Sequence, residues 1–511
     1  MSHWVIAPIL LPLFAGLVLL LGARWRPGIA RGVSLAATAA LLPLALLLLG
    51  LADDGGYHVY ALGDWPAPFG IVLVLDRLAA LMLALTAALA LPALLYASRG
   101  SDQRGTNFHA LFQLQLLGLN GAFLTGDLFN LFVFFEILLI ASYALLLHGQ
   151  GPARARSGLH YVVLNLIGSS LFLFAVGTLY GVTGTLNMAD LAARVAQAGA
   201  AEVPLVRAGA LLLLVVFALK AALLPLYFWL PRAYAAAPAP VAALFAIMTK
   251  VGVYSILRVY TLIFGAEAGL LADVALPWLW PLALATLALG AIGALAAPDL
   301  RTLIAYLVVI SVGTLLAAFA FGTPETLAAA LYYLPHTTLV TGGMFLLAGV
   351  IRRQRGAQAD RFDPSGPVSE PALLGPLFFV GAVAAAGMPP LSGFIGKALL
   401  LSSIPPGEPA AWLWGIVLGG SLIVLIALSR AGSRLFWRTL DQPAVAARAD
   451  RLHLLSVVLL LAAAPLLAVF ATPVMNFTEA TARQLSEPGG YIGAVLGDRQ
   501  PSQYAQGGSA P

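Results

Sequence analysis

Residues 371–401 read PALLGPLFFVGAVAAAGMPPLSGFIGKALLL. The stretch is apolar almost throughout and long enough to cross a bilayer, which takes about 20 apolar residues. The Pro389-Pro390 pair removes backbone hydrogen bonds and breaks the helix, and Lys397 follows the break. Inside a membrane, broken backbone is tolerated only where it is buried in protein or lines a water-filled cavity. The stretch therefore predicts a broken membrane helix with a cation in its second half.

A second stretch has the same combination of a lysine and a proline. Residues 219–226 read LKAALLPL, with Lys220 ahead of Pro225. Helices interrupted near the centre of the bilayer are typical of ion transporters. Ordinary proline kinking, which is common in membrane helices, explains the two breaks by themselves equally well.

The composition extends this interpretation to the whole chain. The 511 residues contain no cysteine, 61% are apolar and only 10% are charged, whereas soluble proteins carry about 25% charged residues. This excludes a soluble enzyme, a disordered chain and a disulfide scaffold, and predicts an all-α polytopic membrane protein, because lipid cannot satisfy an open sheet edge. Fourteen transmembrane helices are predicted, at about residues 4–23, 32–52, 76–97, 108–125, 128–147, 159–182, 206–230, 236–263, 275–297, 300–321, 326–350, 371–401, 411–433 and 453–474. The first could be a cleaved signal peptide, but it has no basic region before it and no small-residue cleavage site, so we interpret it as a true span.

The spacing of the two broken spans predicts an internal repeat. They are the seventh and the twelfth, and two five-span units offset by an odd number of spans must be inverted relative to each other. Spans 4–8 (residues 108–263) and 9–13 (residues 275–437) would be the repeats. Residues 1–107 would form spans 1–3 and residues 453–474 span 14, with an external tail at residues 475–511 whose segment 477–487 could lie as a surface helix and whose residues 500–511 look disordered.

The loop charges predict the orientation. Arginines gather in loops after odd-numbered spans, as at Arg352, Arg353 and Arg355, whereas most acidic residues lie in loops after even-numbered spans. Because arginine-rich loops stay in the cytoplasm, both termini are expected outside it. The same bias accounts for the net charge of +5 without a nucleic-acid partner.

Ionisable residues inside the spans are few. The chain has three lysines, Lys220, Lys250 and Lys397, and all three fall within predicted spans; Glu136 is the one acid near the middle of a span and His336 the one deep histidine. Each charge at the centre of a membrane helix costs about 2.5–3.5 kcal/mol, and such residues usually mark ion or proton paths. We therefore interpret these five residues as a proton relay. Structural ion pairing, or a simple helix–helix hydrogen bond for His336, is the alternative.

Two predicted spans carry further polar residues. Tyr254 and Arg258 follow Lys250 at four and eight residues, so they share its helical face. Gln113 and Asn120 share a face of the fourth span, where they could hold water or simply join helices.

With these residues in place, the chain resembles the proton-pumping, antiporter-like membrane subunits shared by respiratory complex I and the Mrp-type cation/proton antiporters. The match covers spans 4–13. It rests on Phe135-Glu136, on Lys220 with Pro225 and Trp229-Leu230-Pro231, on Pro238-x-Pro240-Val241 ahead of Lys250, and on the proline-rich stretch ending at Lys397. The resemblance implies fourteen helices, two inverted repeats and a central hydrophilic axis. Along that axis it implies a Glu136–Lys220 pair, a middle Lys250, a His336 link and a terminal Lys397.

Residues 126–136 (GDLFNLFVFFE) and 182–190 (VTGTLNMAD) resemble the D-type branch of the Mrp-type (Mnh, Pha) antiporter family. Complex I subunits often have histidine where this chain has Tyr227, and the largest of them carries a long C-terminal lateral helix that this sequence lacks. The resemblance implies a proton-translocating subunit of a multisubunit Na⁺(K⁺)/H⁺ antiporter in the bacterial inner membrane. Its partners would be a larger, homologous A-type subunit, small membrane subunits and the lipid bilayer.

The sequence predicts no enzyme but a secondary transporter subunit. It has no cysteine, no glycine-rich nucleotide loop and no histidine pair at haem spacing, so we expect neither cofactor nor metal. Two alternatives stay open: an antiporter-like pumping subunit of an NADH-quinone oxidoreductase or related membrane hydrogenase, and a structural scaffold for partner transporters. The choice between Na⁺ and K⁺, the cation's route and the stoichiometry are also open.

Overall fold

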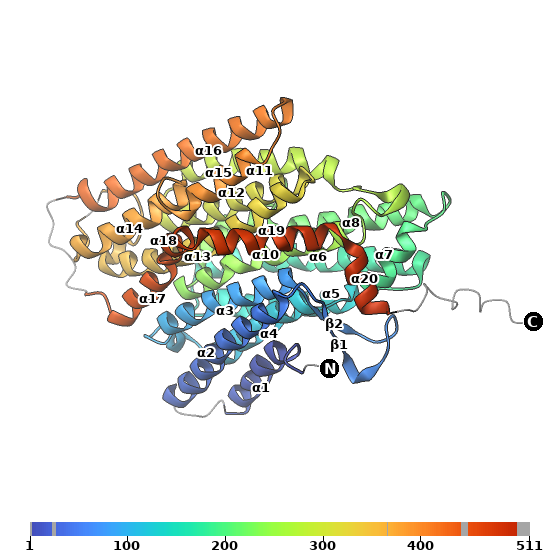
Figure 1. Ribbon diagram of the computed structural model, residues 1–511. Coiled ribbons are helices and arrows are strands. Elements are labelled where there is room, and N and C mark those ends of the chain that lie inside the picture. Colours follow the sequence, from blue (N-terminus) through green and yellow to red (C-terminus); the bar gives the residue numbers. More distant parts are fainter. Residues whose placement is uncertain (1–2, 23–26, 365, 441–447, 498–511) are drawn as a thin grey trace, which may run out of the picture.

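The computed structural model describes residues 3–22, 27–364, 366–440 and 448–497. Most of this chain is helical, and the longer helices lie side by side in one bundle (Figure 1). The first half comprises α1 (Ala7–Leu21), α2 (Pro27–Ala52), α3 (Arg77–Ala97), α4 (Phe108–Leu124), α5 (Leu128–Leu147), α6 (Pro152–Thr183), α7 (Met188–Ala196), α8 (Val203–Ala221), α9 (Trp229–Ala236) and α10 (Ala239–Leu262). The second half comprises α11 (Leu276–Ala296), α12 (Leu300–Ala320), α13 (Pro324–Gln354), α14 (Pro371–Ala386), α15 (Ser392–Ser402), α16 (Glu408–Gly432), α17 (Arg451–Leu461), α18 (Ala463–Val469), α19 (Ala471–Ser486) and α20 (Pro488–Leu496).

Every predicted span coincides with helix in the described chain. Eleven helices are individually long and apolar enough to cross a membrane, and α1, α14 and α15 are shorter apolar helices. A polytopic helical fold is therefore confirmed, while the count of fourteen spans and the repeats stay predictions.

The all-α fold class is confirmed, and one loop adds a short hairpin that the sequence did not predict. Between α2 and α3 the strands β1 (His58–Ala61) and β2 (Val72–Leu75) pair antiparallel, with His58 opposite Leu75. β2 is buried along its whole length and leads directly into the N-cap of α3. The hairpin therefore belongs to the folded body of the protein.

Both predicted helix breaks are present. α8 ends at Ala221 and the next residue, Ala222, has φ +61°; the chain becomes helical again only at α9. α14 ends at Ala386 and Gly387 has φ +78°, after which α15 begins at Ser392. The left-handed conformation at each break stops the helix and leaves its last carbonyl groups free for other donors.

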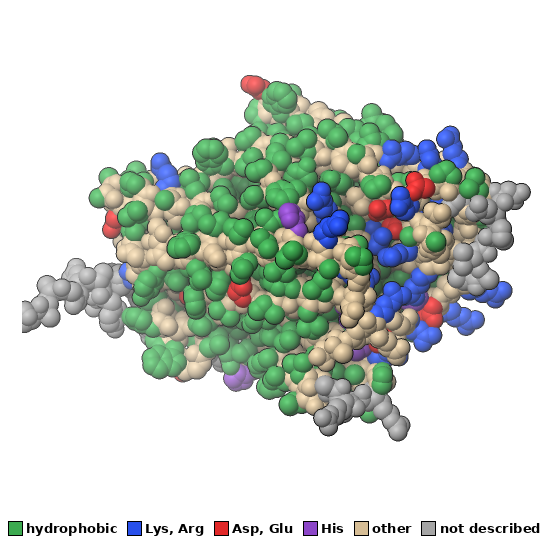
Figure 2. All heavy atoms as spheres, turned by 180° about the vertical axis from the view of Figure 1, so that it is seen from behind, with side chains coloured by type: hydrophobic (Ala, Val, Ile, Leu, Met, Phe, Trp, Pro, Cys, Tyr) green, Lys and Arg blue, Asp and Glu red, His purple; other side chains and the backbone are tan. Residues whose placement is uncertain are grey.

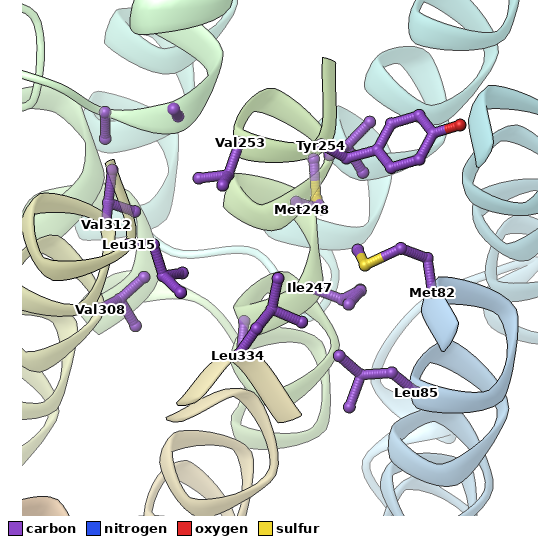
Figure 3. Packing of buried hydrophobic residues seen from close by; sticks show 14 of the residues in the cluster. Met82, Leu85, Ile247, Met248, Val253, Tyr254, Val308, Val312, Leu315 and Leu334 are labelled. Carbon is purple, nitrogen blue, oxygen red and sulfur yellow. The ribbon is translucent and has the colours of Figure 1, made fainter. Parts of the chain in front are cut away.

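Helices α10, α12 and α13 form the centre of the bundle. The most apolar stretch of α10 is wholly buried, and those of α12 and α13 are 94% buried, whereas those of α2 and α16 are only 33% buried. Polar side chains on the central helices therefore face protein. Apolar residues fill much of the space around them: Figure 3 shows Met82 of α3, Ile247 of α10 and Leu334 of α13 pointing toward one another.

A helix is present at residues 477–487, for which a surface helix was suggested. Those residues belong mainly to α19, which continues the path of α17 and α18 and lies along α13 (Figure 1). One face of α19 buries Thr478, Thr481 and Leu485 against the body. The segment 500–511, for which disorder was predicted, lies outside the described residues.

Arginines gather at one end of the molecule, as Figure 2 shows for the face turned away from the viewer in Figure 1. We call this the basic end and define it by Arg99, Arg104, Arg154, Arg232, Arg301, Arg352 and Arg353. Its loops are tied together by Arg99–Asp450 and Arg301–Asp360 ion pairs and by a hydrogen bond from Arg353 to Ser101.

Asp102 anchors this end. It accepts hydrogen bonds from Arg31 at 2.5 Å and from His109 at 3.1 Å. Burial alone would raise the pKa of Asp102, but these two partners outweigh burial and hold its pKa well below the ordinary value. The carboxylate is therefore a fixed charge that locks the loop after α3.

Candidate functional site

Glu136 lies on α5, partly exposed at the surface of the bundle. Its carboxylate accepts a hydrogen bond from the Ser169 hydroxyl of the neighbouring α6. The aromatic residue beside it, Phe135, is buried and faces Lys220, whose Nζ lies 5.9 Å from the ring centroid. The Glu136 carboxylate thus sits at the edge of the protein interior.

Lys220 occupies the last turn of α8, just before the break, and is 5% exposed. Its Nζ donates a hydrogen bond to Asn165 Oδ1 of α6 at 3.2 Å. The predicted direct ion pair with Glu136 is absent from the described structure. Asn165 and Ser169 stand one helical turn apart on α6, so α6 connects the two charges through neutral groups.

Lys250 lies in the middle of α10 and is 1% exposed. Its Nζ donates to Ser311 Oγ of α12 at 2.5 Å, and the same hydroxyl donates to the Val308 carbonyl at 2.6 Å. A hydroxyl is a weaker partner than a carboxylate for a buried ammonium group. The site therefore stabilises the charged lysine only modestly.

The other residues on this face of α10 are occupied elsewhere. The Tyr254 hydroxyl donates to the Phe123 carbonyl at 2.7 Å. Arg258 forms a buried ion pair with Asp76, the N-cap of α3, at 2.7 Å. Arg258 is thus a fixed charge between α10 and α3.

His336 on α13 is 1% exposed, and its Nδ1 shares a hydrogen bond with Ser392 Oγ at 2.8 Å. Ser392 opens α15, directly after the second break. The next residue must be glycine: a Cβ on Gly393 would lie 2.7 Å from His336 Nε2 and 2.3 Å from the Ala384 carbonyl. The break therefore brings the backbone of the twelfth span against the imidazole.

Lys397 on α15 donates to the Ala386 carbonyl and to Ser421 Oγ of α16, both at 2.8 Å. The Ala386 carbonyl is one of the groups that the end of α14 leaves without a helical partner. A cavity of about 20 Å³ is lined by both Lys397 and His336. That is enough room for one water molecule, so the structure brings these two predicted residues to one small polar site.

The five predicted residues form three groups. Glu136 and Lys220 are linked through α6, Lys250 and Ser311 join α10 to α12, and His336 and Lys397 share the cavity at α15. Apolar side chains, among them the labelled Val308, Leu315 and Leu334, lie between α10, α12 and α13 (Figure 3). Among the described residues, no side-chain hydrogen bond of these five residues joins one group to another.

The sequence did not identify the hydrogen-bond partners, which are Asn165, Ser169, Ser311, Ser392 and Ser421. Their residue types carry little signal, because serine in a helix often bonds only to its own backbone. Gln113 and Asn120 take the packing role: Gln113 donates to Ser34 and Thr38 of α2, and Asn120 to the Pro8 carbonyl of α1. Within the described residues no group of three or more histidines and carboxylates is placed to hold a metal ion.

Comparison with known proteins gives consistent matches. Residues 125–425 match the family described as NADH:quinone oxidoreductase/Mrp antiporter, transmembrane. The chain is 44% identical, over 96% of both sequences, to the D-type subunit of a probable K⁺/H⁺ antiporter from Rhizobium meliloti. It is 37% identical to the D-type subunit of the Na⁺/H⁺ antiporter from Bacillus subtilis, over 97% of this chain and 100% of the relative.

The fold is also similar to that of a solved protein. A chain of the Mrp complex from Dietzia sp. DQ12-45-1b superposes with a TM-score of 0.86 at 27% sequence identity, covering 97% of this chain and all of that one. The likeness thus extends from α1 to the tail and is not limited to the matched region 125–425.

Proposed function

Because the chain belongs to the NADH:quinone oxidoreductase/Mrp antiporter transmembrane family, we propose that it is the D-type subunit of a multisubunit monovalent cation/proton antiporter and relays protons for that complex. The observation that carries the proposal is the setting of its three lysines. All three lie inside membrane helices and bond to hydroxyl, amide or carbonyl groups, with no carboxylate among the partners that the structure describes. Such lysines can give up a proton when desolvated, which is what a relay needs.

The relay runs along Glu136, Lys220, Lys250, His336 and Lys397. In this proposal the chain crosses the membrane fourteen times, and helices α4–α10 and α11–α16 form two inverted repeats. Corresponding caps support the repeats: Asp127 and Asp299 each cap a helix, α5 and α12, and each forms an isolated β-bridge to the segment after the following helix. Both repeats then break in the helix that precedes their last long helix.

In this proposal the helix breaks supply polar backbone groups to the relay. Each leaves backbone carbonyl groups inside the protein, and one of them, at Ala386, already receives the Lys397 ammonium group. Water that enters beside Lys397 or Lys220 would connect the three groups and let protons pass between them. The cation path would involve small membrane subunits and a larger homologous partner. The basic end would face the cytoplasm of a bacterial inner membrane, with both termini on the other side.

The assembled complex in inverted vesicles tests this function. Addition of Na⁺ or K⁺ should dissipate a preformed proton gradient, and Lys250→Gln should abolish that response while Glu408→Gln, at an exposed helix start, should not. Co-purification of flavin and iron–sulfur clusters would instead place the chain in a quinone oxidoreductase. A Lys250→Gln complex with full exchange would leave only a scaffolding role.

A further inference from the structure

A cavity of about 290 Å³ opens at the basic end, where the last turns of α3 and α13 meet the starts of α6 and α10. Four arginines line it, Arg104, Arg154, Arg352 and Arg353, and no acidic residue does. The cavity lies away from the lysine groups of the proposed relay. Its charge therefore calls for a separate explanation.

None of the four arginines forms an ion pair with a carboxylate of the described residues, although Arg353 bonds to His453 and Ser101. Arg154 donates only to backbone carbonyls, those of Ala236 and Gln150. Arg104 and Arg352 have no side-chain hydrogen bond or ion pair with any residue that the structure describes. Two carboxylates of the basic end are already engaged, because Asp102 is held by Arg31 and His109 and Asp360 by Arg301.

A buried hydroxyl in the same wall also lacks a partner. Tyr96 is 1% exposed, and its hydroxyl makes no hydrogen bond within the described residues. The Arg353 guanidinium lies over its ring at 5.6 Å, and the hydroxyl lies against Gly349, another residue of the wall, where a Cβ would approach it to 2.5 Å. The hydroxyl is enclosed by protein and not accessible from the cavity, so Tyr96 contributes the ring beneath Arg353 rather than a donor to a ligand.

Membrane orientation explains arginines at this end but not this grouping. Arg156 and Arg232 lie at the same end and line an outward-facing hollow on α6 and α9, in contact with bulk surroundings. The four cavity arginines instead come from three segments, α6, α13 and the loop after α3, and line one cavity without an acidic residue. Arg104 and Arg352 are exposed there, and Arg154 and Arg353 are partly buried. Membrane orientation alone does not require arginines of three separate segments to line one cavity.

We propose that this cavity binds a phosphate group, supplied either by the headgroup of an anionic phospholipid or by free inorganic phosphate. Guanidinium groups match phosphate oxygens through paired hydrogen bonds. The start of α10 at Ala239 lies in the wall, and the positive end of a helix favours an anion. A bound phosphate would join the ends of α10 and α13, the two most enclosed helices.

The test uses the assembled complex after removal of endogenous lipid by detergent exchange. Sodium phosphate, against sodium chloride of equal ionic strength, is titrated by calorimetry. In parallel, complexes in phosphatidylglycerol or phosphatidylcholine nanodiscs are analysed by native mass spectrometry for retained lipid. The cavity variant is Arg104→Gln/Arg352→Gln, and Arg156→Gln/Arg232→Gln is the matched control with the same charge change at the same end.

The wild type and the control variant should bind alike, and the cavity variant should bind at least about tenfold more weakly, as the loss of a charge-assisted hydrogen bond predicts. Phosphate binding identifies free phosphate as the source, and selective retention of phosphatidylglycerol identifies the lipid. Equal binding by wild type and cavity variant, or no binding of either probe by the wild type, would overturn the proposal. Should the cavity variant fail to assemble, Arg104→Lys/Arg352→Lys decides the matter, because lysine keeps the charge but not the paired hydrogen bonds: weaker binding supports the site and unchanged affinity rejects it.

Discussion

The arginines and lysines that are buried or partly buried in this protein have different partners. Arg258 is paired with Asp76, Arg301 with Asp360 and Arg31 with Asp102. Lys250 and Lys397, by contrast, bond to hydroxyl and carbonyl oxygens. A carboxylate would hold a lysine permanently charged, whereas a neutral oxygen lets the charge come and go. The chain therefore separates fixed charges from groups suited to proton transfer.

Lys250→Arg should preserve the charge and abolish transport. Arginine does not release its proton, because its pKa lies above about 12, whereas a desolvated lysine can. We expect the variant complex to assemble and to show little or no proton flux in inverted vesicles at any pH between about 7 and 9. Wild-type flux would mean that Lys250 is a fixed structural charge, and its relay role would have to be abandoned.

Ser311→Ala should impair the same step without changing any charge. The hydroxyl is the one side-chain partner of the Lys250 ammonium group that the structure describes, and its loss costs about 1–3 kcal/mol for the unpaired group. We expect proton flux to fall by about tenfold with assembly intact. Ser255→Ala is the matched control, since that buried hydroxyl on α10 bonds only to its own helix. Equal flux in the two variants would contradict a role for Ser311.

At the scale of elements, the helix α6 lies between Glu136 and Lys220, which were expected to contact each other directly. Asn165 holds Lys220 and Ser169 holds Glu136, so the two charges communicate through one face of a helix. Because Glu136 and Lys220 each bond to a separate neutral partner here, a direct pair between them would form only in another step of transport.

A mutant cycle distinguishes these arrangements. Glu136→Gln and Lys220→Ala should each abolish exchange, and the double variant should assemble better than either single one if the charges meet during the cycle, because breaking a buried pair costs about 3–5 kcal/mol. Assembly is measured as the yield of intact complex after solubilisation. Strictly additive defects would show that α6 keeps the two charges apart at all times.

The loop after α3 depends on a buried carboxylate at the basic end. Its partners lower the pKa of Asp102, so its stabilising effect is present above the ordinary aspartate range near about 4 and is lost as pH falls below it. Asp102→Asn should therefore reduce the stability of the complex at pH 7 by about 1–3 kcal/mol. The measurement is the melting temperature, which should fall. The difference from wild type should stay constant from pH 7 down to about 4 and shrink as pH falls below that value. A difference that stays constant below about 4 as well would mean that the side chain acts by shape alone.

For the whole molecule, the sequence predicts helices far better than it predicts contacts. Long apolar runs located the helices, and proline with glycine or alanine located both breaks, because these signals are local. The β1–β2 hairpin was missed because its strands, His58–Ala61 and Val72–Leu75, are four residues each within a loop of mixed polarity.

Contacts between helices depend on the fold and left no local signal. Nothing in the sequence around Ser311 or Asn165 distinguishes these residues from other polar residues of the spans, and only the packing of α12 on α10 and of α6 on α8 turns them toward lysines. The missing Glu136–Lys220 contact has the same origin. The sequence identifies the five relay residues because they are ionisable. Their hydrogen-bond partners could be identified only from the structure.

The outer surface of the bundle leads to the last prediction, that the purified chain alone will not catalyse antiport. Apolar side chains such as Ile140 of α5 and Phe174 of α6 are more than 60% exposed, and between these helices the partly exposed Glu136 carboxylate bonds only to Ser169 in the described structure. A carboxylate at this depth facing lipid is costly, so a partner subunit is expected to cover it.

Liposomes provide the measurement for this prediction. They should hold either the chain alone or the complete complex at equal protein-to-lipid ratio, with an internal pH-sensitive dye. A pulse of Na⁺ or K⁺ should move protons only in liposomes with the complex, and a Glu136→Gln complex should match the chain alone. Robust cation-driven proton flux from the chain by itself would show that the relay and the cation path are both complete within these 511 residues.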